Sequence, residues 1–316
     1  MSHWGPLRGS LLFTRRPQLD LFGAGILLVL CILWGIQQVT IKLALEGISP
    51  VMQGGLRSVI AVALLYFWMR AKSIPVFGTD GAWRPGMVAG MLFAVEFALI
   101  YWGLAFTSAS RMIVFIYLAP FVVAAGIHVI VPEERLRGLQ FLGMALAFAG
   151  VVFVFQDRGD SVLSERAWIG DLMGIGGAVF WGATTLVIRA TRMVRIEPSR
   201  ALFYQLLVSA LLLPIISMLL GEPGVISVTP MVIGSMAFQG VVVAFASYLA
   251  WFWLLAHYPV PQLSSFTFMA PLFGVAAGVI VLNEPFSTGL LVGGGLVASG
   301  IYVVNRRQLP AMAASD

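Results

Sequence analysis

Two apolar segments of this chain occur twice, once in each half. Residues 33–42 read LWGIQQVTIK and residues 180–189 read FWGATTLVIR, so each copy has a tryptophan eight positions before a cationic residue. A longer pair, 115–134 and 266–285, places a proline thirteen positions before a glutamate in both copies. The copies lie 147 residues apart in the first pair and 151 in the second. Duplication in an apolar chain is typical of transporters built from repeats, with the substrate site between them.

The composition favours lipid as the solvent. Of the 316 residues, 59% are hydrophobic and 10% are charged, whereas soluble domains have about 25% charged residues. The apolar run 21–44 is too long for a signal peptide and lacks a cleavage pattern. The sequence therefore predicts an all-α polytopic membrane protein. Ten segments approach the length of about 20 residues that a spanning helix needs, namely 21–44, 51–70, 85–106, 109–131, 138–155, 169–188, 199–220, 231–256, 261–282 and 288–304.

The positions of Lys and Arg predict which way these helices run. With the N-terminus in the cytoplasm, the inner segments hold fourteen of the nineteen basic residues and the outer segments hold three. Cytoplasmic loops are enriched in Lys and Arg, so both termini are expected in the cytoplasm, with the chain in the cytoplasmic (inner) membrane. No basic run carries interleaved aromatic residues, so nucleic acid is not an expected partner.

Five helices per half is an odd number, so the second repeat should be inverted relative to the first. Two inverted repeats have two nearly equivalent packings, one open to each side of the membrane, which is the basis of alternating access. The expected parts are a cytoplasmic segment 1–20, a first five-helix repeat 21–155, an outer linker 156–168, a second five-helix repeat 169–304 and a cytoplasmic tail 305–316.

Several short motifs, in order along the chain, carry a resemblance to a known family. They are Trp34-Gly35 with Lys42, Arg57, residues 107–111, residues 118–134, residues 248–253, Ala270-Pro271 and Asn283-Glu284-Pro285. Over about 21–305 the chain resembles the drug/metabolite transporter (DMT) superfamily, EamA type. The resemblance implies ten helices and secondary transport, more often export than import. The substrates it implies range from amino acids and their derivatives to purines, cationic drugs, and sugar and phosphate metabolites. Asn283 replaces the usual glycine, and only a changed turn is expected there.

Glu96 lies near the middle of the third predicted span. An ionised carboxylate at that depth costs roughly 2.5–3.5 kcal/mol on insertion scales, so it should face a cavity or a partner. Three interpretations are open: a permanent pair with Arg57, a site for a cationic group of the substrate, and a proton carrier. The mates of Glu96 and Arg57 in the other repeat are Ser247 and Gln205, so neither charge is symmetric. The resemblance favours a structural or gating role for Arg57.

Aromatic, amide and hydroxyl side chains are the other candidates for substrate binding. They are Trp34, Gln37, Gln38, Tyr101, Tyr117, Trp181, Thr185, Tyr248 and Trp251. Aromatic faces can stack on a substrate, but aromatics near span ends often form the interfacial belt instead. Lys42 and Arg111 are expected to snorkel to water and headgroups.

Pro120 and Pro271 are repeat mates in the fourth and ninth predicted spans, and they join Arg57 and Glu96 as candidates for coupling or gating. Proline removes a backbone donor and kinks a helix, so the two could act as matching hinges or as fixed bends for packing. Small residues recur at a spacing that suits close helix contact within the monomer or in a homodimer. These are Gly143 and Ala147 in the fifth span, and Gly295 and Ser299 in the tenth.

No cofactor or metal is expected. Cys31 is the single cysteine, and His128 and His257 lack a second ligand at metal spacing. The predicted function is outward secondary transport of a small organic metabolite, such as an amino acid or derivative, or of a drug, by alternating access. A channel-like permease and a membrane enzyme or scaffold are the alternatives, and a coupling proton remains open.

Overall fold

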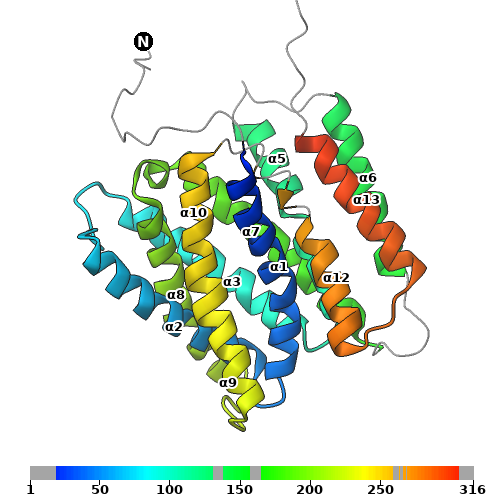
Figure 1. Cartoon of the computed structure of the whole chain (residues 1–316), viewed down its shortest axis with the longest axis horizontal. Helices are drawn as coiled ribbons and strands as arrows, with labels where there is room; N and C mark the ends of the chain where they lie inside the picture. Colours follow the sequence, from blue (N-terminus) through cyan, green and yellow to red (C-terminus); the bar gives the residue numbers. More distant parts are fainter. Residues whose placement is uncertain are drawn as a thin grey trace, which may run out of the picture.

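The computed structural model describes residues 19–130, 138–156, 165–258, 263, 266–267 and 269–305, which form helices joined by turns and loops (Figure 1). Within these ranges no β-strand is present, and Ile48 and Val225 form an isolated bridge. The first half contains α1 (Leu21–Ala44), α2 (Pro50–Ala71), α3 (Trp83–Gly103), α4 (Ala109–Ile116), α5 (Ala119–Ile130) and α6 (Gly138–Gln156). The second half contains α7 (Ala167–Ala190), the 3-10 turn η2 (Arg192–Arg195), α8 (Pro198–Leu219), α9 (Pro230–Ala237), the π-helix η3 (Phe238–Ser247), α10 (Tyr248–His257), α12 (Met269–Leu282) and α13 (Thr288–Asn305).

The helices match an integral membrane protein in length and surface. Among the described residues, seven helical stretches are long and apolar enough to cross a membrane. They include Ala109–Gly126, which combines α4 with part of α5, and Pro230–Leu254, which combines α9 and η3 with part of α10. Three shorter apolar helices, Phe141–Val154, Met269–Leu282 and Thr288–Gly300, lie within α6, α12 and α13. Large apolar side chains are exposed along the helices; for example, Phe67 is 69% exposed and Ile280 is 76% exposed. Such a surface requires lipid around it.

The contacts made by helices of one half are repeated by their counterparts in the other. α1 lies against α12, and its counterpart α7 lies against α4 and α5, the counterparts of α12. α3 contacts both α7 and α8, and the η3 rod contacts both α1 and α2. The remaining large contacts join α2 to α8 and α6 to α13. In Figure 1 the dark-blue start of α1 and the red end of α13 lie at the same end of the bundle.

Glycines let two of these helix pairs approach closely, and both belong to the repeated Trp-Gly motif. A Cβ added at Gly35 of α1 would lie 2.7 Å from the backbone nitrogen of Gly274 in α12. A Cβ added at its mate Gly182 in α7 would lie 2.6 Å from the Cβ of Val122 in α5. The first sequence repeat is therefore a packing motif that joins each leading helix to the proline-bearing helix of the other half.

The predicted prolines lie where a helix is interrupted. The fourth predicted span is interrupted at Tyr117 and Leu118, between α4 and α5, and Pro120 follows in the first turn of α5. Pro271 likewise lies in the first turn of α12, after a turn at Thr267. Proline is tolerated in a first turn because the N–H groups there have no helical acceptor. The two prolines thus lie just after interruptions of the helices, and a hinge role for them stays a prediction.

The small residues of α6 pack within the monomer. A Cβ added at Gly300 of α13 would lie 2.4 Å from the carbonyl oxygen of Gly143 and 2.8 Å from the nitrogen of Ala147. A Cβ at Gly295 would meet nothing within 4 Å, so Gly295 makes no close contact with the described chain. Asn283 has a φ of 52°, in the left-handed region that glycine and asparagine favour. The asparagine therefore adopts a backbone conformation before Glu284 that glycine also favours.

Some predicted segments lie outside the described residues. They are residues 1–18 of the N-terminal segment, the inner loop with Glu133 and Glu134, residues 157–164 of the outer linker, residues 259–262 and the tail from Arg306.

Candidate functional site

Arg57 of α2 is completely buried. Its guanidinium carbon lies 3.8 Å from the centre of the Phe97 ring and 5.8 Å from that of Tyr101, so the cation packs on aromatic faces of α3. The Tyr101 and Tyr248 hydroxyls lie close enough to interact with it, yet none of its three nitrogens meets a hydrogen-bond acceptor in good geometry among the described residues. A guanidinium has five N–H donors, so Arg57 keeps unused donors away from water.

Glu96 of α3 is 4% exposed. Its Oε2 atom has no hydrogen-bond partner among the described residues. Arg57 attracts the carboxyl electrostatically, but the two side chains form no direct ion pair, because the nitrogens of Arg57 are themselves without partners. The permanent pair with Arg57 considered above is therefore not present in this structure as a direct hydrogen-bonded contact. Substrate binding and proton carriage by Glu96 stay predictions.

Two further tyrosines join these charges. Tyr248, the first residue of α10, interacts electrostatically with both Arg57 and Glu96. Tyr117, at the end of α4, is 6% exposed and interacts with Tyr248. We call Arg57, Glu96, Tyr101, Tyr117 and Tyr248 the central cluster. It brings together five of the residues predicted from sequence, from α2, α3 and the turn after α4 in the first half and from α10 in the second.

Aromatic pairs flank the central cluster. The Trp34 indole N–H of α1 donates to the Ser247 hydroxyl at 2.9 Å, next to Tyr248 in the chain. The Trp34 and Trp251 rings meet edge to face with centres 5.5 Å apart. Trp181, 36% exposed on α7, meets Tyr117 in the same way at 5.9 Å. The two repeat-mate tryptophans therefore approach the cluster from both halves.

The remaining predicted residues differ in their surroundings. Gln37 and Gln38 are both 6% exposed, and the Oε1 atom of Gln38 lacks a partner among the described residues. Thr185 donates its hydroxyl to the Trp181 carbonyl one turn earlier at 3.1 Å. The structure thus leaves a free acceptor on Gln38, while the hydroxyl proton of Thr185 is already used within its own helix.

Gln239 is a member of the polar interior that the sequence analysis missed. It lies on η3 and accepts a 2.7 Å hydrogen bond from the Tyr101 hydroxyl. Its amide donates to the Thr40 carbonyl at 3.2 Å and to the Gln53 side chain at 3.3 Å. An amide inside an apolar span is the signal that could have found it, because a glutamine must find a partner in lipid. The network ties α1, α2, α3 and η3 together behind Tyr101.

Arg111 and Asp171 form a buried ion pair where α4 begins. The Arg111 Nε and Nη2 atoms donate to the two Asp171 oxygens at 3.1 and 2.5 Å, and the side chains are 6% and 1% exposed. Thr107 donates its hydroxyl to Asp171 at 2.6 Å and accepts at its carbonyl from the Lys42 ammonium at 2.7 Å. The expected snorkelling is therefore wrong for Arg111. Asp171 was missed, although an acid inside a predicted span is itself a signal.

Two glutamates from the second half cap helices of the first at the same end. Glu284 accepts from the Ala109 and Ser110 backbone N–H groups at 2.7 and 3.0 Å, at the start of α4. Glu222 accepts from Val51 and Met52 at 3.2 Å, at the start of α2. A carboxylate is favoured at a helix N-terminus by the free N–H groups and the macrodipole. Glu284, which lies in the repeated motif, therefore links the two halves.

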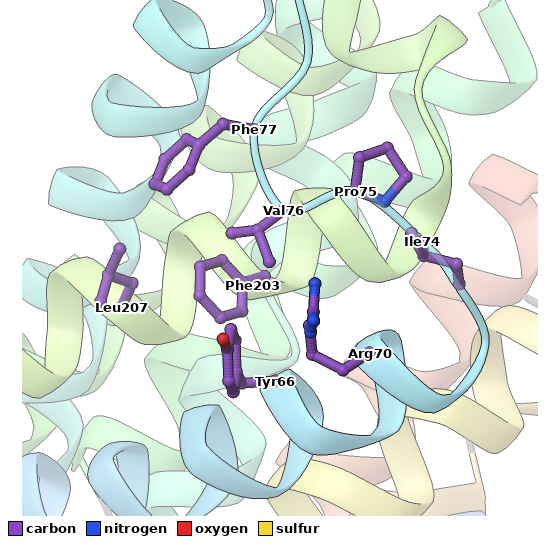
Figure 2. A pocket seen from close by; sticks show the side chains of 8 residues that line it. All are labelled: Tyr66, Arg70, Ile74, Pro75, Val76, Phe77, Phe203 and Leu207. Carbon is purple, nitrogen blue, oxygen red and sulfur yellow. The ribbon is translucent and has the colours of Figure 1, made fainter.

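The described pockets lie away from the central cluster. One of about 480 Å³ opens between α2, the loop after it and α8, where Figure 2 shows Tyr66 and Arg70 beside Phe203. Another pocket, of about 400 Å³, is wholly apolar and lies between α2 and the consecutive helices α9 and η3. No predicted site residue lines either pocket. Among the described residues no three His, Cys, Asp or Glu side chains gather as metal ligands.

The fold and site together define a class. An apolar helical bundle whose halves pack alike around buried charges and aromatic rings is the architecture of a membrane transporter. The chain belongs to the EamA-like transporter family, whose model matches residues 21–156 and 168–306, one copy in each half. The family lies in the drug/metabolite transporter superfamily, as the motifs implied. The chain is therefore a transmembrane transporter rather than an enzyme.

Proteins with similar sequences are also named as transporters. A protein named "Probable amino-acid metabolite efflux pump" from Escherichia coli (strain K12) is 24% identical over 87% of this chain and 92% of its own length. The uncharacterized transporter YvbV from Bacillus subtilis (strain 168) is 25% identical over 92% of this chain and 93% of its own. A solved crystal structure shares the fold with a TM-score of 0.62, at 19% identity over 89% of this chain and 96% of that one.

Proposed function

We propose that this transporter moves a small organic metabolite by alternating access between two inverted five-helix repeats, with ten membrane crossings. The matched packing of the two halves supports the two-repeat arrangement, since α1 against α12 corresponds to α7 against α4 and α5. The inversion follows from the proposed odd number of five crossings per half. The single observation that carries the proposal is the central cluster. Buried charges at the meeting of both halves are expensive in a membrane and mark a substrate pathway by default.

The proposed substrate is an amino acid, an amino-acid derivative or a drug, and the proposed direction is outward. Support comes from the name of the Escherichia coli relative, an amino-acid metabolite efflux pump. The cluster adds chemical support, because a few polar groups among aromatic rings are what a site for a small amphipathic ligand requires. The chain carries no predicted nucleotide-binding segment, so uphill movement would use an ion or substrate gradient. Glu96 is the proposed site for a cationic group of the substrate or for a coupling proton.

The proposed orientation has both termini in the cytoplasm. It rests on the fourteen basic residues of the inner segments against three in the outer ones. A periplasm-active reporter fused after Asp316 should stay inactive, while the same reporter fused within the outer linker 156–168 should be active. Activity at Asp316 would contradict the orientation.

Counterflow in proteoliposomes tests the transport proposal. Vesicles preloaded with an unlabelled substrate, found by a thermal-shift screen of amino acids and derivatives, should accumulate the labelled compound transiently above its outside concentration. The overshoot requires a carrier that exposes its site to one side at a time. A channel-like permease would equilibrate the label without overshoot, and that result would contradict alternating access.

A further inference from the structure

Two opposite charges are buried in the central cluster without pairing with each other. Arg57 has no exposed surface and Glu96 is 4% exposed. Neither the Arg57 nitrogens nor the Glu96 Oε2 atom meets a hydrogen-bond partner in good geometry among the described residues, and the neighbours of Arg57 are the uncharged Tyr101 and Tyr248 hydroxyls. The buried charges Arg111 and Asp171, by contrast, are bonded directly to each other. An unused donor set beside an unused acceptor needs an explanation, because buried polar groups are normally satisfied.

The contact of Arg57 with Phe97 leaves its N–H groups without an acceptor atom. The guanidinium carbon lies over the Phe97 ring, 3.8 Å from the ring centre, and a ring face is not one of the oxygen or nitrogen acceptors that the five N–H donors prefer. The guanidinium presents these donors as a fork that matches the two oxygens of a carboxylate. The free oxygen of Glu96, by contrast, can accept from an ammonium group, because an ionised carboxylate only accepts.

We propose that Arg57 and Glu96 form one binding site for a zwitterion, with the carboxylate of the substrate on Arg57 and its ammonium group on Glu96. This inference rests on the proposed transport function and assigns the recognition of its substrate. A zwitterion adds no net charge to the apolar interior, and it satisfies both unpaired groups at once. A substrate with a single charge satisfies one group and leaves the other buried and unpaired.

The surroundings of the two charges indicate what the rest of the substrate contacts. Tyr101 and Tyr248 lie beside Arg57, and the Trp34–Trp251 pair adjoins Tyr248 through Ser247. These aromatic faces suit an apolar or aromatic side chain. Phenylalanine is therefore the probe of choice. Phenylalaninamide lacks its carboxylate, and 3-phenylpropionate lacks its ammonium group.

The test is a crossed comparison of the three probes on the purified full chain, with apparent Kd taken from thermal shifts. The wild-type protein should bind phenylalanine about 10–100-fold more tightly than either single-charge probe, the range expected for a hydrogen-bonded charge. Arg57→Gln should bind phenylalanine and phenylalaninamide alike. Glu96→Gln should bind phenylalanine and 3-phenylpropionate alike. Arg57→Lys keeps the charge without the fork and should fall between wild type and Arg57→Gln.

The matched control is Arg84→Gln, which removes an exposed arginine at the start of α3 and should keep the wild-type pattern. The proposal is overturned if Arg57→Gln still discriminates against phenylalaninamide as the wild type does, or if none of the three probes stabilises the wild-type protein. Counterflow separates the two claims. Counterflow of phenylalanine that Arg57→Gln leaves unchanged would overturn this site and keep the transporter. The crossed binding pattern without counterflow would keep the site and contradict the transport function.

Discussion

Asp171 shows how this chain stabilises a charge inside its apolar bundle. Both carboxylate oxygens accept from Arg111, and one also accepts from the Thr107 hydroxyl. The pair joins α4 of the first half to α7 of the second with almost no exposure. Because the bidentate geometry is complete, this pair has a structural role. Arg57, equally buried but without such a partner, does not fit that role.

Replacing Asp171 by alanine should therefore destabilise the protein strongly. Removal of one member of a buried pair costs about 3–5 kcal/mol, since the other charge stays buried without it. The melting temperature in detergent should fall, and the double change Asp171→Leu with Arg111→Leu should recover most of the loss. A single variant that melts like the wild type would show that Arg111 does not depend on Asp171.

Asp80 lies in the loop between α2 and α3 and gives the chain a pH-dependent contact. Hydrogen bonding from the Arg200 guanidinium, at 2.7 Å, and from the Ala82 N–H lowers the pKa of the Asp80 carboxyl. A folded-state pKa below the unfolded value of about 3.9 stabilises the fold above that value, and the contribution is lost as pH falls through the folded pKa. The side chain is 39% exposed, so water screens the pair and the effect should be small.

Asp80→Asn should accordingly lower the melting temperature slightly at neutral pH and have no effect at pH values below the folded pKa. The measurement is the difference in melting temperature between wild type and variant from about pH 7 down to about pH 3, spanning the carboxyl range. A difference that grows toward acid pH would contradict the direction of the pKa shift.

At the scale of elements, the repeated Trp-Gly motif determines how closely helices approach. Gly35→Ala should destabilise the contact of α1 with α12, because the new Cβ would lie 2.7 Å from a backbone nitrogen that cannot move aside alone. Overpacking of this kind costs typically about 1–3 kcal/mol. The matched control is Gly25→Ala on the same helix, where a Cβ meets nothing within 4 Å. It should be neutral or slightly stabilising, since alanine favours a helix over glycine.

A thermal-unfolding comparison of the two alanine variants checks this contact. Equal melting temperatures for Gly35→Ala and Gly25→Ala would show that α1 and α12 separate at little cost. A selective loss in Gly35→Ala would show that the motif is needed for packing, whatever Trp34 contributes to substrate binding.

The elements were predictable to the extent that local patterns determine them. The starts of α2 and α8 lie at Ser49-Pro50 and Glu197-Pro198, directly before the predicted spans 51–70 and 199–220, because proline suits the first helical turn. The interruption at Tyr117 and the π-helix η3 were not predicted as such. A proline indicates a bend but not the residues that unwind, and a π-helix depends on tertiary contacts such as those of Gln239 with α1, α2 and α3.

For the whole molecule, the sequence located the buried charges but not their geometry, and which residues bind the substrate stays a prediction. The cost of burying charge selected Arg57 and Glu96, and five predicted residues meet in the central cluster. Whether the two charges pair depends on how α2 and α3 face each other, and no spacing along the sequence specifies that. Asp171 and Gln239 are polar residues inside apolar spans and could have been selected, but their partners, which lie 60 and 138 residues away in the chain, could not.

The most direct test of alternating access asks from which side the central cluster can be reached. Cys31 is the single cysteine, so Cys31→Ala with Tyr248→Cys places one thiol in the cluster. A membrane-impermeant maleimide should label it from either side of oriented vesicles, and an excess of substrate on one side should shift the labelling between faces. Labelling from one side alone, unchanged by substrate, would contradict a site that alternates between the two faces.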